Sequence, residues 1–99
     1  MIARQWRGLA KRTCAKAYVT HLRTQTLPTL SAIPGFVDAL ILRRDVAQGV
    51  EFLVVTRWAS LDAIRAFAGK HAEQAVVPPA VHSMMVEYDR VVCHYEIVQ

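Results

Sequence analysis

Four histidines are the side chains best suited to proton-transfer chemistry in this chain: His21, His71, His82 and His94. A histidine titrates near neutral pH, so it can act as a general base or bind a metal ion. No two of them stand in the short spacings typical of zinc sites. His71 and His82 are eleven residues apart, but the Pro78-Pro79 pair breaks the helix that would align them. His94 shares a strand face with Glu96, and no third ligand accompanies them. We therefore predict no metal site.

Four aromatic side chains could form the walls of a cavity for a flat ligand: Trp6, Trp58, Phe67 and Tyr88. Ligand cavities are lined mainly by apolar and aromatic groups, with a few polar groups among them. The alternative is that these rings pack in the core or in a subunit interface. The sequence leaves both interpretations open.

Two arginines, Arg7 and Arg57, lie in otherwise apolar segments. Either could hold a phenolate or enolate anion by its charge, or form an ion pair at a strand edge or an interface. Cys14 and Cys93 stand in no metal-binding or redox spacing, and we expect both to be small buried hydrophobes. No glycine-rich phosphate loop, nucleophile elbow or dinucleotide-binding fingerprint occurs.

The length and composition are those of one globular domain spanning residues 1–99. Of the 99 residues, 54% are apolar and 20% charged, which is far from the composition of disordered chains. No run of about 18 apolar residues is present, so we expect no membrane span. No apolar core follows the first basic residues, as it would in a secretory signal, and we expect a cytoplasmic location.

The charge is unevenly distributed. Residues 1–37 contain six basic residues and no acid, a charge of +6, and the remainder has six basic and eight acidic residues, which gives the net charge of +4. Such a segment can be a transit peptide, a surface for an anionic partner, or the solvated face of an ordinary helix. The apolar spacing within it favours the ordinary folded helix.

The hydrophobic periodicity predicts the order β-α-β-β-α-β. Residues 2–9, 36–44, 50–58 and 85–98 have the pattern of strands. A helix begins at Thr13 and ends before the Ile33-Pro34-Gly35 turn, with Pro28 kinking or restarting it. Ser60 is a strong N-cap for a second helix that ends at Gly69. This order predicts an α+β fold of the ferredoxin-like type, a four-stranded antiparallel sheet with two helices on one face.

The third predicted strand indicates a partner for the sheet. It is apolar on both sides, with Phe52 and Val54 on one and Leu53 and Val55 on the other. A strand buried on both faces has this pattern, whereas two helices cover only one face of a sheet. We therefore predict a homodimer formed through the sheet face.

Several segments together resemble the antibiotic biosynthesis monooxygenase family of the dimeric α/β-barrel superfamily. They are MIARQWRG at the start, AIPGF after the first helix, EFLVVTRWASLDAIRAFAG across the third strand and second helix, AVVPPAV, and the terminal HYEIV. The resemblance covers nearly the whole chain. It implies a ferredoxin-like monomer that pairs into a barrel-like dimer.

The resemblance also implies a function: a small cofactor-independent monooxygenase or oxidase acting on an aromatic, phenolic or quinol molecule. Such a protein deprotonates the substrate, stabilises the anion, excludes water and admits oxygen. His71 or His82 would be the base and Arg7 or Gln5 the anion partner. The pocket, between helices and sheet, would be lined by the four aromatics named above. The alternative is a non-catalytic dimeric ligand-binding or stress-response domain of the same fold.

Two related activities are not expected. The haem-degrading branch of the superfamily uses an Asn on the first strand, a Trp in the second helix and a following His. Here Gln5, Phe67 and Val77 fall near those positions, so we expect no haem degradation.

The RNA-recognition motif shares the element order, but the strand VEFLVVTRW lacks its aromatic signature, so we expect no nucleic-acid partner.

Overall fold

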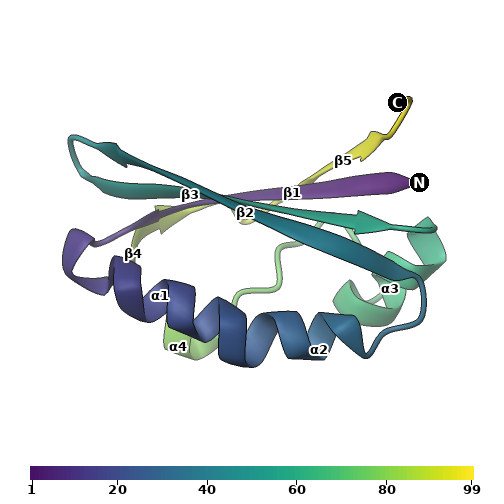
Figure 1. Ribbon diagram of the computed structural model, residues 1–99, viewed down its shortest axis with the longest axis horizontal. Coiled ribbons are helices and arrows are strands. Elements are labelled where there is room, and N and C mark those ends of the chain that lie inside the picture. The colour runs from purple at the N-terminus through teal and green to yellow at the C-terminus, as the bar shows by residue number, and fades with distance from the viewer.

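A single antiparallel sheet with helices on one face makes up the molecule (Figure 1). The computed structural model describes all 99 residues. In chain order the elements are β1 (Ile2–Ala10), a 3-10 turn (Arg12–Cys14), α1 (Ala15–His21), a π-helical turn (Leu22–Thr26), α2 (Leu27–Ser31), β2 (Phe36–Val46), β3 (Gly49–Trp58), α3 (Leu61–Ala68), α4 (Pro79–His82), β4 (Met85–Tyr88) and β5 (Cys93–Glu96). This is the predicted α+β, ferredoxin-like architecture. No helix is both long and apolar enough to cross a membrane.

The sheet has the order β2-β3-β1-β4, and β5 also pairs with β1. The prediction of one long final strand over residues 85–98 is wrong, because it is broken into β4 and β5, so the sheet has five strands rather than four. β4 pairs with the end of β1 at residues 8–10, and β5 pairs with its beginning at residues 2–5. Between β4 and β5 the backbone pairs with residues 73–75 instead of β1. The Ala75 N–H donates to Arg90 O, and the Val92 N–H donates to Glu73 O. The segment before α4 thus takes the hydrogen bonds that would have continued the strand.

The first helical segment runs without a break from the 3-10 turn to α2, and Pro28 lies in the first turn of α2. Proline has no N–H and its ring clashes with the carbonyl four residues earlier. The chain accommodates this with the π turn directly before it, in which the Leu27 N–H donates to Leu22 O. Such π turns are rare and are frequent at functional sites. Here the turn lies next to His21, opposite the middle of the sheet.

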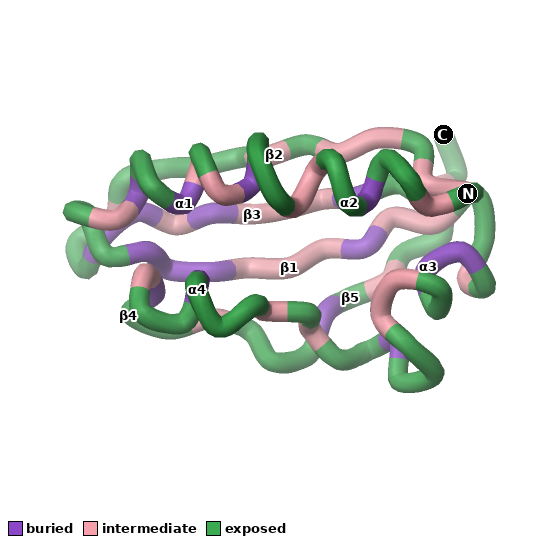
Figure 2. The backbone as a smooth tube through the Cα atoms, turned by 90° about the horizontal axis from the view of Figure 1, so that it is seen from below, coloured by how far each residue is buried: buried purple, intermediate pink, exposed green.

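The core fills the space between helices and sheet in two clusters. One contains Tyr18 and Phe52, whose rings meet edge-on with centroids 4.9 Å apart. The other contains Leu30, Trp58 and Ile64. In Figure 2 the buried residues lie along β1 and β3 and on the turns of α1 and α2 that face them. The two clusters leave a gap between them, in which the candidate site lies.

The second helix, α3, begins and ends where its sequence signals place it. The Ser60 side chain accepts a hydrogen bond from the Ala63 N–H, as an N-cap should. Gly69 follows the last helical residue with φ of +80°, a conformation that side chains with a Cβ resist. The chain then leaves the helix and runs under the sheet toward α4.

The face of the sheet opposite the helices is uncovered. Leu53 and Val55 of β3 lie on it half-buried, and Leu40 of β2 is 56% exposed. This confirms that β3 is apolar on both faces, while the predicted homodimer remains a prediction. Cys93 lies on the same face and is exposed, and Cys14 is only half-buried, so the expectation that both are buried is wrong. β5 is a short strand of four residues that pairs only with β1, and nothing covers its outer face.

Candidate functional site

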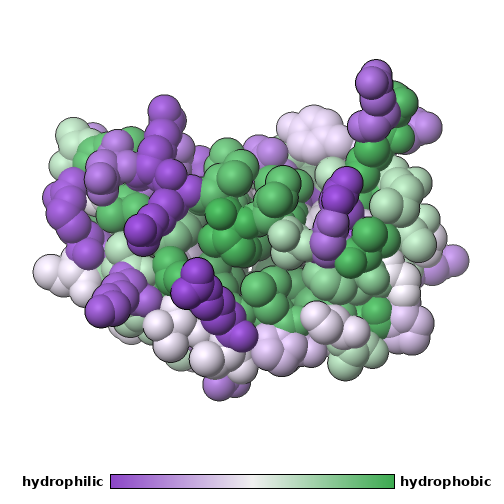
Figure 3. Space-filling view, in the orientation of Figure 1, coloured by the Kyte–Doolittle hydropathy of each residue, from purple (hydrophilic) through white to green (hydrophobic).

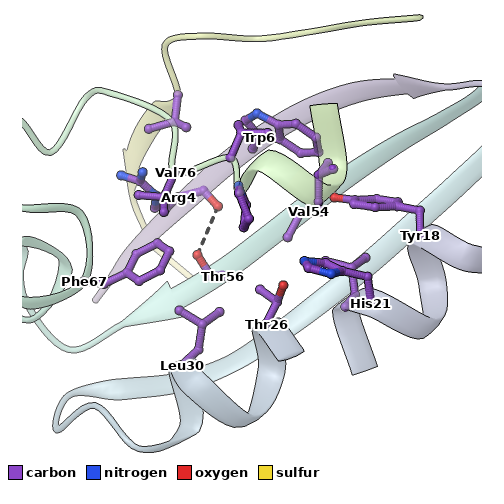
Figure 4. Close-up of a pocket in the computed structure, with 15 residues that line it drawn as sticks. Arg4, Trp6, Tyr18, His21, Thr26, Leu30, Val54, Thr56, Phe67 and Val76 are labelled. Atoms are coloured by element: carbon purple, nitrogen blue, oxygen red, sulfur yellow. Dashed lines mark hydrogen bonds between the residues drawn. The ribbon is translucent and has the colours of Figure 1, made fainter. Parts of the chain in front are cut away.

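A cavity of about 70 Å³ lies between the helices and the sheet (Figure 4). Its walls come from β1, β3, the helical segment 18–30, α3, the segment before α4, α4 itself and Val92. Ten of its fifteen lining residues are hydrophobic. They are Arg4, Trp6, Tyr18, His21, Leu22, Thr26, Leu30, Val54, Thr56, Phe67, Val76, Val77, Pro78, Val81 and Val92.

A buried arginine forms one end of this cavity. Arg4 is only 5% exposed, and no carboxylate lies within ion-pair distance of it. Its guanidinium donates to the Ala72 carbonyl, to the Gln74 carbonyl (2.8 Å) and to His94 Nε2 (3.0 Å). Burial lowers the Arg4 pKa to about 10, which still leaves the group charged at neutral pH. The cavity thus has a fixed positive charge at this end.

The bond to His94 defines the protonation of that imidazole. A guanidinium only donates hydrogen bonds, so His94 Nε2 accepts and the ring is neutral with its proton on Nδ1. Burial lowers the His94 pKa, the Arg4 charge lowers it further, and Glu73 opposes the shift. Arg4 uses three of its five N–H groups on these partners. Its other two N–H groups have no hydrogen-bond partner within the chain.

His21 and Tyr18 form the opposite end. The His21 Nε2 atom is buried and has no hydrogen-bond partner within the chain, which is uncommon for a buried polar atom. In Figure 4 the His21 ring reaches into the cavity from α1, and the Tyr18 hydroxyl is directed toward Val54. Burial raises the Tyr18 pKa, so this hydroxyl keeps its proton and can donate it in a hydrogen bond.

Apolar side chains separate the two polar ends. The Phe67 ring lies 5.7 Å from the Arg4 guanidinium carbon and so contacts the cation through its face. Val76, Val77 and Pro78 close the cavity from the segment before α4. A cavity of about 150 Å³ is known to hold benzene, roughly twice the volume present here. An aromatic ring therefore enters only when this segment or a wall side chain moves outward.

Two of the predicted site residues, Trp6 and Phe67, line the cavity. Trp58 does not: it is fully buried behind Phe67, with ring centroids 6.0 Å apart, and its Nε1 donates to Thr56 Oγ1 at 2.8 Å. Tyr88 lies beyond Trp6, with centroids 6.3 Å apart, and does not reach the cavity.

The predicted polar residues lie elsewhere. Arg7 and Gln5 are on the uncovered face of the sheet, where Arg7 pairs with Glu51 at 2.7 Å. His71 is exposed, 3.7 Å from a Glu73 carboxylate oxygen. His82 is exposed too, and its Nε2 lies 2.9 Å from Val77 O. None of these four side chains lines the cavity, and their predicted roles stay predictions.

The sequence contained signals for the residues that the prediction missed. Arg4 alternates with Trp6 on one face of β1, and this face turns out to be the one that the helices cover. Tyr18 and His21 are three residues apart on the apolar face of the first helix. Nowhere in the chain do three or more His, Cys, Asp or Glu side chains gather in a way that could hold a metal ion.

A model of the family described as antibiotic biosynthesis monooxygenase matches residues 1–78. The chain belongs to the antibiotic biosynthesis monooxygenase family. The match runs from β1 through the segment that closes the cavity. A search of curated proteins finds no match.

Solved structures share the fold of this antibiotic biosynthesis monooxygenase family member at low identity. A Bacillus cereus protein assigned to the same family has a TM-score of 0.69 and 17% identity, over 100% of this chain and 93% of that one. One from Deinococcus radiodurans has 0.68 and 17%, over 100% and 94%. The haem degrader MhuD of Mycobacterium tuberculosis, solved with two haems in its active site, has 0.61 and 19%, over 100% and 97%. At these identities the likeness establishes the fold alone.

Proposed function

We propose that this protein is a cofactor-independent monooxygenase that oxidises a small phenol or quinol in the cavity between helices and sheet. The observation that carries the proposal is the unpartnered, buried Nε2 of His21 in an apolar cavity whose other end holds the charge of Arg4. Membership of the antibiotic biosynthesis monooxygenase family supports the reaction class.

The first step is removal of the phenolic proton. A neutral imidazole nitrogen accepts a proton from a hydroxyl within hydrogen-bond reach, and His21 Nε2 has no competing partner. The resulting phenolate is stabilised by a hydrogen bond from Tyr18 and, from the other end of the cavity, by the positive charge of Arg4. Such fixed charges act strongly in a site from which water is excluded.

The phenolate then supplies the electrons for oxygen. One atom of O₂ bonds to the ring carbon that loses its hydrogen, and the other atom leaves as water with the two hydrogens removed from the substrate. The product is a quinone. The protein contributes the proton acceptor, the charge and the apolar walls that keep bulk water from the reactive anion.

The cavity size limits the substrate. At about 70 Å³ it lies well below the 300–1,000 Å³ typical of drug-sized ligands. A molecule of one or two rings fits after a modest outward movement of Val76, which is exposed. A haem, the ligand of the structural neighbour MhuD, is far larger, and Val77 and Phe67 offer it no ligand atom. We therefore propose that haem is not a substrate.

The uncovered face of the sheet supports a second part of the proposal. We propose that a second copy of the chain covers it, because Leu40, Leu53 and Val55 form an apolar strip there that a lone subunit would leave in water. Arg57 and Asp38 form an ion pair beside this strip.

Oxygen uptake with a panel of naphthols and quinols tests the reaction, and isotope-labelled O₂ shows whether one oxygen atom enters the product. We expect His21→Ala to lower turnover at least 100-fold, the size of general-base effects. His71→Ala and His82→Ala are matched controls that remove histidines outside the cavity, and they should stay within about twofold of wild type. Loss of turnover in either control instead of His21→Ala would reassign the base.

The small cavity favours one alternative, a non-catalytic domain that binds a phenol without oxidising it. Binding of the same compounds without oxygen uptake in any member of the panel would establish this alternative. In that case the residues assigned to the binding site would be the same.

A further inference from the structure

A second hollow, about 730 Å³ in volume, lies on the other side of the helical segment. It runs between α1, the π turn and the edge strand β2, and only Leu22 is shared with the lining of the catalytic cavity. In Figure 3 hydrophobic surface fills the middle of this face, between the sheet and the helices, and hydrophilic surface borders it on the left, at the end of the β2–β3 hairpin. We call this hollow the edge groove.

The edge groove is lined by cations and by no acid. Arg12, Lys16, Arg23 and Arg43 line it. Arg12 is occupied: it donates to Val46 O at 2.7 Å and to Gly49 O at 3.3 Å, which fixes the start of the helix beside the hairpin. The other three make no ion pair, whereas four other arginines are each paired with a carboxylate. The charge at the hairpin end of the groove is therefore uncompensated.

One acid lies nearby without neutralising this charge. Asp45 follows Arg43 by two residues on the same side of β2, is exposed, and forms neither an ion pair nor part of the lining. The acid-free first third of the sequence thus has a structural consequence, because three of its six basic residues gather at one groove.

The floor of the edge groove is aliphatic. Val19, Leu22, Leu27 and Ile41 form it, and the only aromatic ring is that of the buried Phe52. From Lys16 to Leu27 the helical segment advances about 16 Å, so the floor is a long trough with Lys16 and Arg43 near its hairpin end and Arg23 about 10 Å further along. An alkyl chain suits such a floor better than a flat ring or a nucleic-acid base, which would need exposed aromatic rings to stack on.

We propose that the edge groove binds a free fatty acid, with its carboxylate at Lys16 and Arg43 and its alkyl chain along Val19 and Ile41. A chain of about a dozen carbons matches the length of the floor, which is about 16 Å. The cations of the rim attract an anionic head, and the volume lies within the range of small-molecule sites. This inference does not rest on the proposed oxidation, which uses a different cavity.

Calorimetric titration with dodecanoate, kept below micelle formation, tests the proposal. We expect saturable binding, with backbone amide shifts confined to residues 12–27 and 41–43. Lys16→Gln/Arg43→Gln should weaken binding about tenfold, since two exposed charge-assisted contacts are lost. Thr20→Trp, which fills the groove from its exposed helical side without a change of charge, should weaken it further.

The matched control is Lys70→Gln/Arg90→Gln. It removes the same charge from two exposed residues outside the groove, and its affinity for dodecanoate should equal that of wild type. Dodecyltrimethylammonium carries the same tail with a cationic head and should not bind.

Three results would overturn the proposal. The first is equal loss of affinity in the control and the groove variants, which would indicate a general charge effect. The second is a set of amide shifts around Phe67 instead of the groove, which would place the fatty acid in the catalytic cavity. The third is binding to anionic phosphatidylglycerol vesicles without binding to monomeric dodecanoate, which would make this face a membrane-binding surface.

Discussion

Replacing Arg4 by methionine tests whether the buried guanidinium holds the site together. Its three hydrogen bonds tie β1 to the Ala72 and Gln74 carbonyls and to His94, and a bond from a charged donor contributes about 1.5–3 kcal/mol. Burial of the charge opposes these bonds: it lowers the Arg4 pKa to about 10, a cost of roughly 3 kcal/mol at about 1.4 kcal/mol per pKa unit. Methionine keeps the apolar stem but leaves the buried Ala72 carbonyl without its donor.

We expect Arg4→Met to lower the free energy of unfolding by about 3 kcal/mol, because the hydrogen bonds outweigh the cost of burying the charge. Urea denaturation followed by circular dichroism measures this as a midpoint about 2 M lower. Arg90→Met is the control, since the exposed Arg90 side chain makes no hydrogen bond or ion pair, and it should change stability by less than about 0.5 kcal/mol. A stabilised Arg4→Met protein, as when some buried ion pairs are replaced by apolar residues, would refute this reasoning.

Four further predictions follow from the same geometry. Phe67→Ala should weaken binding of a phenol at least tenfold in a fluorescence titration while the circular dichroism spectrum stays unchanged, since the ring is a half-buried wall of the cavity. The pKa of His94 lies below 6.5 in the folded protein, so as the pH falls the unfolded chain binds a proton at this residue before the folded chain does. The free energy of unfolding should therefore fall as pH drops through 6.5 toward the folded pKa. His94→Gln should remove that slope in denaturation curves from pH 7 to pH 5. Light scattering should give a dimer, and Leu53→Asp should give a monomer, because it places a charge on the uncovered sheet face. Incubation with haemin and a reductant should leave the Soret band no weaker than in a protein-free control.

The alternation of apolar residues was sufficient to predict the first three strands and the two apolar faces of β3, and Ser60 itself indicated the N-cap of α3. These depend on local patterns, which the chain follows. The break between β4 and β5 could not be predicted in this way. It arises because residues 90–92 pair with residues 73–75, a contact between distant segments that no local periodicity records.

The sequence predicted the position of the cavity, between helices and sheet, better than it predicted the residues that line it. Trp6 and Phe67 line the cavity, but Gln5 and Arg7 lie on the opposite face of β1 from Arg4. Alternation predicts that these faces differ, and not which of them the helices cover. The candidate base differs from the prediction for a similar reason: His71 follows α3 and His82 is the last residue of α4, and both side chains are exposed, whereas the packing of α1 on the sheet directs His21 inward.

Binding of a nitrophenol to the protein tests the central claim most directly, because the phenol and its phenolate absorb at different wavelengths. The titration is made one pH unit below the pKa of the free phenol. We predict that the phenolate band grows as the compound saturates wild-type protein, that it is lost in His21→Ala, and that it persists in His71→Ala. Binding without ionisation, or a phenolate band that survives His21→Ala, would contradict the assignment of His21 and the Arg4 charge as the groups that take the proton and hold the anion.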